Sequence, residues 1–286
     1  MLPGVKPQGR GTAALLLCVV LVFLGAGLIA PWAYGLLHVR LDYPFHSYVD
    51  RCLMITALAA IPLFWNRFGL ASWRDLGVRP EGKGEIAWGL ALGLISAATM
   101  LGAAIALGGR MSQNSAGWEV ILILLATAAI VAPLEELLFR GVIQTVLVRD
   151  IGAGAGIAAT SLFFAVVHFI KVPVDFAPQP VTAWSGLAAL GLAFAPFADC
   201  GAIASRFLLL AAVGAVLGVA AWRTGRLWLP IGLHAGWIVG AKLGNRLTAG
   251  VPGHWAAGDF TTNPLSFAAL AAVGIVIWKW PRSSTS

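Results

Sequence analysis

Apolar stretches long enough to cross a lipid bilayer dominate this sequence. The first of them, from Ala13 to Leu37, contains no charged residue, and about 20 such residues form a helix that spans the hydrocarbon core. It is too long for the apolar core of a signal peptide and is predicted to be a retained span. Only 11% of all residues are charged, against roughly 25% in soluble domains. The chain is therefore predicted to be a polytopic membrane protein with an all-α fold, a bundle of transmembrane helices.

Eight segments are predicted as transmembrane helices. A weaker segment at 182–198 contains Pro196 and many small residues, and fits either a ninth span or a re-entrant piece. Cytoplasmic loops carry an excess of Lys and Arg. Leaving Arg140 out of the 19 Lys and Arg, eight spans with a cytoplasmic N-terminus place 11 basic residues inside and 7 outside, whereas nine spans give 10 and 8. This difference favours eight. The predicted spans are 12–37, 50–66, 84–107, 118–148, 153–170, 204–222, 227–245 and 264–280.

Net charge and cysteine content exclude several classes of site. The formal net charge of +7 is modest and scattered, which fits cytoplasmic loops facing anionic lipid better than nucleic-acid binding. The three cysteines, Cys18, Cys52 and Cys200, form no CxxC pair. A disulfide framework or a thiolate metal site is therefore not expected, and the lipid bilayer is the expected environment.

Three charged residues interrupt an apolar run in the sequence PLEELLFRG, residues 133–141. A charge at the centre of a transmembrane helix costs roughly 2.5–3.5 kcal/mol, so such residues need compensation and usually mark function. Glu136 and Arg140 are i, i+4 neighbours in the favourable order and are predicted to form an ion pair. Glu135 points about 100° away and stays available for chemistry. Pro133 removes a backbone donor and predicts a kink just before the two glutamates.

Two histidines, His168 in SLFFAVVHF and His234 in LPIGLHAGW, are predicted to lie at depths in the membrane comparable to that of the glutamates. Glu135 lies about 20 Å from the end of its helix, His168 about 22 Å from the start of its own, and His234 about 12 Å past Arg226. Three helices can thus bring two carboxylates, a guanidinium and two imidazoles toward one buried layer. These groups can activate water and stabilise an oxyanion.

A purely structural interpretation of the same residues is also open. The charges could form an ion pair that holds helices together, or they could extend toward an interface. Each histidine taken alone is more often a packed or capping residue than a functional one. His38, His46 and His254 fall in predicted polar loops and are expected to be solvated.

At these positions the sequence resembles the CPBP family of intramembrane proteases, also called the Abi or CAAX-protease and bacteriocin-processing family. The family pattern is EExxxR, then FxxxH, then HxxxN or HxxxD, on successive transmembrane helices. Here the first motif runs from Glu135 to Arg140, the second from Phe164 to His168, and the third begins at His234. The resemblance covers about residues 118–245, and DLGVRP at 75–80 resembles the loop before the family core.

The third motif departs from the family pattern at its fourth residue, which is Ile238 instead of Asn or Asp. In the family this residue works beside the second histidine in stabilising the oxyanion. Asn245 follows His234 by 11 residues, about three helical turns, and is too far away to substitute directly. The resemblance therefore fits either an active enzyme with a divergent oxyanion site or a branch with weakened activity.

The resemblance implies an intramembrane glutamic endopeptidase without a metal or other cofactor. Glu135, helped by His168, would activate a water molecule, and Glu136 with Arg140 would orient the site. His234 would donate to the oxyanion. The substrate would be a protein or peptide with a membrane-embedded or prenyl-like C-terminal segment, a bacteriocin precursor, or a protein with a C-terminal sorting helix. The location would be the inner (plasma) membrane, in a bacterium.

Three alternatives stay open from the residues. Two glutamates and two histidines could bind zinc as in a metalloprotease, although HExxH is absent and Arg140 would oppose a cation. Buried Glu, Arg and His also serve proton-coupled transporters. An inactive relative could act as a binding or immunity factor. The predicted parts of the chain are N-terminal helices with a cytoplasmic loop (1–115), a CPBP-like protease core (116–250), and a C-terminal loop with the last helix (251–286).

Overall fold

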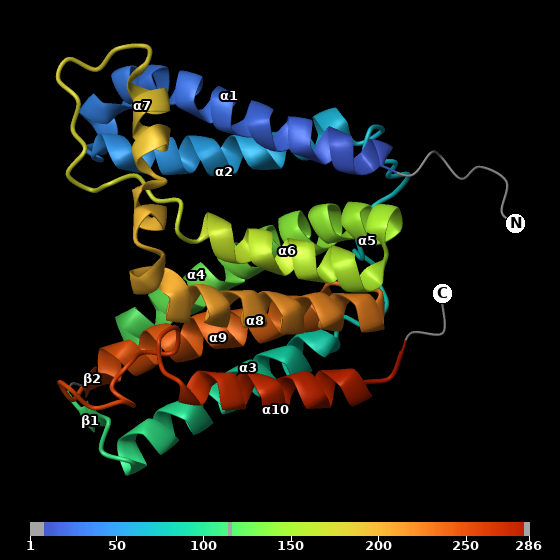
Figure 1. The fold of residues 1–286 in the computed structure, drawn as a ribbon, viewed down its shortest axis with the longest axis vertical. Coiled ribbons are helices and arrows are strands. Elements are labelled where there is room, and N and C mark those ends of the chain that lie inside the picture. Colours follow the sequence, from blue (N-terminus) through green and yellow to red (C-terminus); the bar gives the residue numbers. More distant parts are fainter. Residues whose placement is uncertain (1–8, 114–115, 283–286) are drawn as a thin grey trace, which may run out of the picture. The chain divides into compact units, whose positions relative to one another are not determined.

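The computed structural model describes residues 9–113 and 116–282 and shows the predicted all-α fold (Figure 1). The predicted boundary at 115 lies outside the described residues, and the division into three parts stays a prediction. One two-stranded antiparallel ladder, β1 with β2, pairs Arg110 with Gly250. The elements are α1 (Arg10–Leu41), α2 (Phe45–Phe64), α3 (Glu85–Ala106), β1 (Arg110–Ser112), α4 (Trp118–Glu136), the π-helix η1 (Leu137–Gln144), α5 (Thr145–Ile151), α6 (Ala153–Val167), α7 (Ser185–Leu192), the 3₁₀ helix η2 (Ala195–Ala198), α8 (Cys200–Thr224), α9 (Trp228–Leu247), β2 (Thr248–Gly250) and α10 (Leu265–Lys279).

The chain divides into two compact units. The first contains the residues up to 71 and 165–204, and the second contains 72–164 and the residues from 205 onward. In the first unit, α1 packs against α2 and α7. Its buried core includes Ala26, Val49 and Leu190. Pro31 lies inside α1, where neighbouring helices make such a residue tolerable in a membrane.

The second unit is organised around the tight packing of α3 on α9 (Figure 1). A Cβ added to Gly89 would collide with the backbone carbonyl of Leu229, and one added to Gly236 would lie 2.6 Å from the carbonyl oxygen of Leu90. Small residues at such a crossing let helix backbones approach closely, as is typical of membrane helix pairs. A hydrogen bond also joins the two helices, because the indole N–H of Trp237 on α9 donates to Ser96 Oγ on α3 at 2.8 Å. The position of α9, which carries His234, is therefore fixed by α3. Helix α4 packs on α9 as well, and α10 packs on α3.

By length and composition, five helical segments among the described residues could cross a membrane: α1, α2, α3, α8 and the continuous run Trp118–Ile151. The helices predicted at 153–170 and 264–280 are present but contain only 15 residues each. The predicted segment 182–198 consists of the short elements α7 and η2, and neither is long enough to span a bilayer. The predicted total of eight spans thus stays a prediction.

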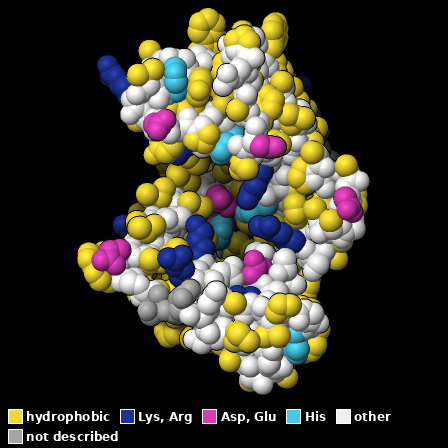
Figure 2. Space-filling view, turned by 90° about the vertical axis from the view of Figure 1, so that its left-hand side faces the viewer, with side chains coloured by type: hydrophobic (Ala, Val, Ile, Leu, Met, Phe, Trp, Pro, Cys, Tyr) yellow, Lys and Arg dark blue, Asp and Glu magenta, His cyan; other side chains and the backbone are white. Residues whose placement is uncertain are grey.

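Large apolar side chains on the surface agree with a multi-pass membrane protein. Hydrophobic side chains cover much of the face drawn in Figure 2. Two of the most exposed apolar side chains of the described residues, Leu36 and Leu63, are each 79% exposed. Soluble proteins rarely expose contiguous apolar surface on this scale.

The prediction that His38 and His46 lie in a loop is wrong, because His38 belongs to α1 and His46 to α2.

Candidate active site

The two adjacent glutamates lie where regular α-helix changes to π-helix. Helix α4 runs through Pro133 to Glu136, and η1 then continues from Leu137 to Gln144 before α5 begins. A π-helix adds a residue to the turn, is rare, and occurs frequently at functional sites. The structure therefore places an irregularity directly after the glutamates. A kink before them stays a prediction.

Glu136 and Arg140 form the predicted ion pair. The distance from Arg140 Nη1 to Glu136 Oε1 is 2.8 Å, and both side chains are completely buried. Arg140 also donates to the carbonyl of Gly214 on α8 at 3.2 Å. Its guanidinium lies over the ring of Phe164, 4.6 Å from the centroid, in the geometry of a cation–π contact. A buried charge needs a partner and hydrogen bonds to be tolerable, and Arg140 has both.

His234 joins the same cluster from α9. It is 6% exposed, and its Nδ1 lies 2.8 Å from Glu136 Oε1. Glu136 pairs with Arg140 as a carboxylate, and a carboxylate only accepts hydrogen bonds, so His234 donates its Nδ1–H. The other ring nitrogen, Nε2, lies 3.8 Å from Glu135 Oε2. Glu136 thus fixes the tautomer of His234 and directs Nε2 toward Glu135.

The side chain of Glu135 is more exposed than that of Glu136. The side chain of Glu135 is 31% exposed, whereas that of Glu136 is fully buried. A group that takes a proton from water must be reachable by water. The exposure of Glu135 agrees with the predicted division between a reactive and an orienting carboxylate.

His168 lies directly after α6, in the turn that follows Val167. Its backbone N–H donates to the carbonyl of Ala165 at 3.2 Å. The sequence predicted it inside a helix over 153–170, but α6 ends at Val167, the residue before His168. His168 belongs to the first unit and the other four predicted site residues to the second. The joint action of His168 and Glu135 stays a prediction.

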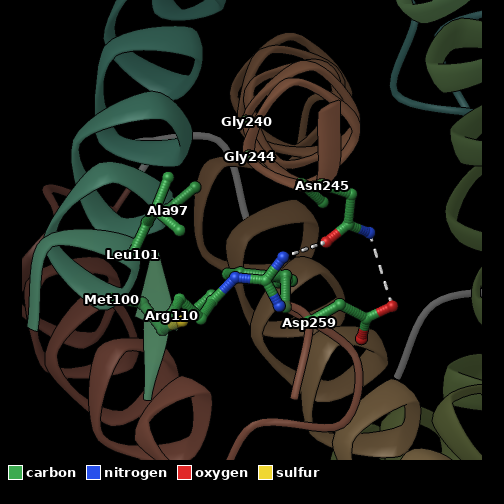
Figure 3. Close-up of a pocket in the computed structure, with 10 residues that line it drawn as sticks. Ala97, Met100, Leu101, Arg110, Gly240, Gly244, Asn245 and Asp259 are labelled. Atoms are coloured by element: carbon green, nitrogen blue, oxygen red, sulfur yellow. Dashed lines mark hydrogen bonds between the residues drawn. The ribbon is translucent and has the colours of Figure 1, made fainter. Parts of the chain in front are cut away.

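Asn245 is engaged far along α9 from His234. Figure 3 shows it accepting a hydrogen bond from Arg110 at 3.3 Å and donating to Asp259 at 3.4 Å. Arg110 is buried and also donates to Thr248 and to backbone carbonyls of the loop before α10. Asn245 therefore ties strands and loop together and does not replace the family residue missing at Ile238, which is half-buried.

Asp259 is held ionised by the same loop. Although its burial favours the neutral acid, hydrogen bonds from Thr261, Thr262 and Asn245 outweigh that effect and lower the pKa of Asp259 below its usual range. The carboxylate thus serves as a fixed acceptor that orders this loop.

Two contributors to the cluster were not predicted from the sequence. One is the carbonyl of Gly214, which accepts from Arg140. The other is Gln144, a buried amide that bonds the carbonyl of Gly218. The sequence did carry a signal for Gln144, because it is a polar residue one turn after Arg140 in an otherwise apolar run. Nothing in the sequence distinguishes Gly214 from the other glycines of α8.

The donor groups of the cluster do not favour a metal. Within residues 9–113 and 116–282, no group of three or more His, Cys, Asp or Glu side chains is arranged to hold a metal ion. Glu136 already binds Arg140 and His234 through Oε1. A cation on this carboxylate would meet the guanidinium at close range and be repelled.

One protein-family description matches the chain, that of the type II CAAX prenyl endopeptidase Rce1-like family, over residues 117–239. The match includes Glu135, Glu136, Arg140, His168 and His234. No curated protein and no solved structure matches the chain. The resemblance to the CPBP proteases, based on three short motifs, is thereby confirmed. Residues 117–239 of this membrane protein form an Rce1-like domain of the CPBP protease family.

Proposed function

We propose that this protein is an intramembrane endopeptidase of the glutamic type, in which Glu135 activates the attacking water. The supporting observation is the buried chain of contacts from Arg140 through Glu136 to His234, beside a carboxylate that is 31% exposed. Glu136 is unsuited to be the base because its charge is committed to Arg140 and His234. The side chain of Glu135 lies at the accessible end of this chain of contacts.

The proposed reaction uses Glu135 twice. The carboxylate takes a proton from water, and the water oxygen attacks the carbonyl carbon of the peptide bond, moving the C=O electron pair onto the oxygen. When this oxyanion collapses, the C–N bond breaks and Glu135 returns the proton to the leaving amine. By the family resemblance, His168 helps to hold or polarise the water. Positioned groups of this kind contribute about 10²- to 10⁴-fold to rate.

His234 is the proposed donor to the oxyanion. Its Nδ1–H is used by Glu136, so only Nε2 can face the substrate. Nε2 can donate to the oxyanion when it carries a proton as well as Nδ1. Electrostatic stabilisation of this type is often the largest single contribution to catalysis.

The proposed substrates are proteins with a membrane-embedded or lipid-modified C-terminal segment. The family description names prenyl endopeptidases, and the multi-pass character of the protein supports a substrate that lies in the bilayer. Bacteriocin precursors and C-terminal sorting helices are further candidates from the family. The proposed location is the inner membrane of a bacterium.

Reconstitution tests the proposal directly. Purified protein in liposomes should cleave at least one of three labelled peptides: one with a farnesylated C-terminal CAAX sequence, its unmodified twin, or a single-span helix with a C-terminal tail. In H₂¹⁸O, the new carboxyl group should gain one ¹⁸O atom, detected by mass spectrometry. If wild-type and His234→Ala proteins give identical traces on all three peptides, the proposal is wrong.

Cleavage is expected to survive extensive treatment with EDTA or phenanthroline. Glu135 and His168 are proposed to activate water without a Lewis acid, and the cluster offers no donor set for a metal. The measurement is initial rate before and after chelation, with metal content of the purified protein determined in parallel. Stoichiometric zinc, with activity lost on chelation and restored by zinc, would establish the metalloprotease instead.

A catalytically inactive binding or immunity factor is the second candidate, and Ile238 is the observation that favours it. Ile238→Asn is expected to raise turnover, because residue 238 lies one turn after His234 on the same helix face and an amide there adds an oxyanion donor. One such donor is worth about 10²- to 10³-fold in rate, which sets the ceiling. An unpaired amide could instead cost about 1–3 kcal/mol of stability, so turnover and Tm should be measured together.

Ile238→Val is the matched control, since it changes volume without adding a polar group and should leave turnover near wild type. A rise in turnover with Ile238→Val as well would assign the effect to packing. If His234→Ala cleaves as fast as wild type, His234 has no oxyanion role whatever Ile238→Asn does.

A further inference from the structure

Two side chains attach the π-helix η1 to α8 in a regular pattern. Arg140 Nη2 donates to the carbonyl of Gly214 at 3.2 Å, and Gln144 Nε2 donates to the carbonyl of Gly218 at 2.9 Å. The donors are four residues apart on one element and the acceptors four apart on the other. Because α8 rises about 1.5 Å per residue, its two carbonyls lie about 6 Å apart on one face. The two side chains thus form a double attachment, of which the shorter bond belongs to Gln144.

The two glycines of α8 make this attachment possible. A Cβ on Gly214 would lie 2.9 Å from Ser161 Cα, and one on Gly218 would lie 2.7 Å from Gln144 Oε1 and 3.0 Å from Ile157 Cγ2. Real Cβ atoms do not tolerate such distances to backbone or closely packed atoms. At Gly214, helix α8 therefore approaches the backbone of α6 closely, and at Gly218 it leaves room only for the side chain of Gln144.

Burying the polar amide of Gln144 at this position lowers the stability of the fold. It is 4% exposed, and its Oε1 is buried without a hydrogen-bond partner. A buried amide that satisfies only part of its hydrogen-bonding capacity costs stability compared with an apolar side chain of the same length. Packing alone would be served better by methionine. The bond from Nε2 to Gly218 is what the amide adds at this position.

We propose that Gln144 is a positioning residue for the candidate active site, an inference that rests on the proposed protease function. Gln144 is the last residue of η1 and Arg140 lies in its middle. A π-helix is rare and occurs mostly as a single turn within an α-helix, so we infer that side-chain attachments keep this eight-residue stretch in register. A return to α-helical register would turn the flanking side chains by up to about 100°. By holding the end of η1 on α8, Gln144 keeps Arg140 on Glu136, and Glu136 on the Nδ1 of His234.

Gln144→Met tests this proposal, because it preserves length and volume while removing both polar atoms. We expect kcat to fall about 10- to 100-fold, since displacements near 1 Å in a site cost that much, with KM within about twofold. The Tm should stay within about 2 °C of wild type, because the lost hydrogen bond is offset by the loss of an unpaired buried oxygen. A purely structural role predicts the opposite, with kcat following Tm.

A second readout does not depend on cleavage. In protein labelled with ¹⁵N-histidine, with the His234 signal assigned by His234→Ala, Gln144→Met should shift or broaden the Nδ1 signal that reports the bond to Glu136. Thr160→Val is the matched control. It removes another buried side-chain bond to a helix carbonyl, that of Thr160 to Gly156 at 2.8 Å on α6, and should change neither kcat nor the His234 signal.

Gly218→Ala separates positioning from packing. Alone, the added Cβ should lower both Tm and kcat because it collides with Gln144 Oε1. Combined with Gln144→Ala, it gains room, so Tm should recover while kcat stays low. Wild-type kcat and a wild-type His234 signal in Gln144→Met would overturn the positioning role. An absence of cleavage in wild type with an altered His234 signal in Gln144→Met would refute the protease function and leave the positioning role standing.

Discussion

Glu135→Gln is expected to lower turnover by about 10²- to 10⁴-fold, the contribution of a positioned general base, without loss of folded protein. The amide keeps the shape of the side chain and removes only its basicity. Glu135 is 31% exposed and lies 3.8 Å from His234 Nε2, at the accessible end of the cluster. The measurement is the initial rate in liposomes together with Tm in detergent. Wild-type turnover in this variant would rule out Glu135 as the base.

Glu136→Gln provides a control one residue away. It is the same chemical change, but Glu136 is fully buried between Arg140 and His234. Its loss should therefore lower Tm as well as turnover, because the guanidinium is left as an uncompensated buried charge. The contrast between the two variants, one affecting rate alone and the other affecting rate and stability, distinguishes the reactive from the orienting carboxylate.

Local spacing explains what could be predicted of the site. The pairing of Glu136 with Arg140 follows from an i, i+4 relation within one helix, which requires no knowledge of the fold. That relation persists although the backbone between the two residues is partly π-helical. The approach of His234 was predicted only as a shared layer. Its bond to Glu136 Oε1 depends on how α9 packs on α4, and this packing is a tertiary property.

The close approach of α8 could not be predicted, for the same reason. The carbonyls of Gly214 and Gly218 become partners of Arg140 and Gln144 only because the fold brings α8 within reach of these two side chains. The π-helix itself has no sequence signature in this segment. Both features depend on long-range packing, whereas periodicity reports only which face of a helix is apolar.

Hydropathy located the helices, whereas the number of spans stays a prediction. All eight predicted segments are helical, within a few residues at each end. Helix α9 has 20 residues but is less apolar than the others, because it carries His234, Lys242 and Asn245. Several of its residues are fully shielded by neighbours, among them Leu229 and Leu233. A helix covered by protein does not need a lipid-compatible surface, so composition alone does not settle whether it spans.

Arg140→Leu is expected to lower folded yield and Tm as well as activity. Arg140 and Glu136 are both completely buried, and the guanidinium also bonds Gly214 and lies over Phe164. Removing one partner of a buried ion pair costs about 3–5 kcal/mol. His234 remains on Glu136 Oε1, so the carboxylate keeps one hydrogen-bond donor, and the loss is expected at the lower end of this range. Thermal unfolding in detergent measures the effect.

Two further variants locate the origin of that loss. Glu136→Gln combined with Arg140→Leu removes both charges and should recover part of the lost Tm, but not activity, because His234 then lacks the carboxylate that fixes its tautomer. Arg74→Leu breaks the exposed pair with Glu81, where the ions are 3.6 Å apart, and should change stability by less than about 1 kcal/mol. If Arg140→Leu and Arg74→Leu unfold at the same temperature, the buried pair does not stabilise the protein. If the double variant regains activity along with Tm, Glu136 does not orient His234, and the proposed path from Arg140 to the oxyanion donor fails at that step.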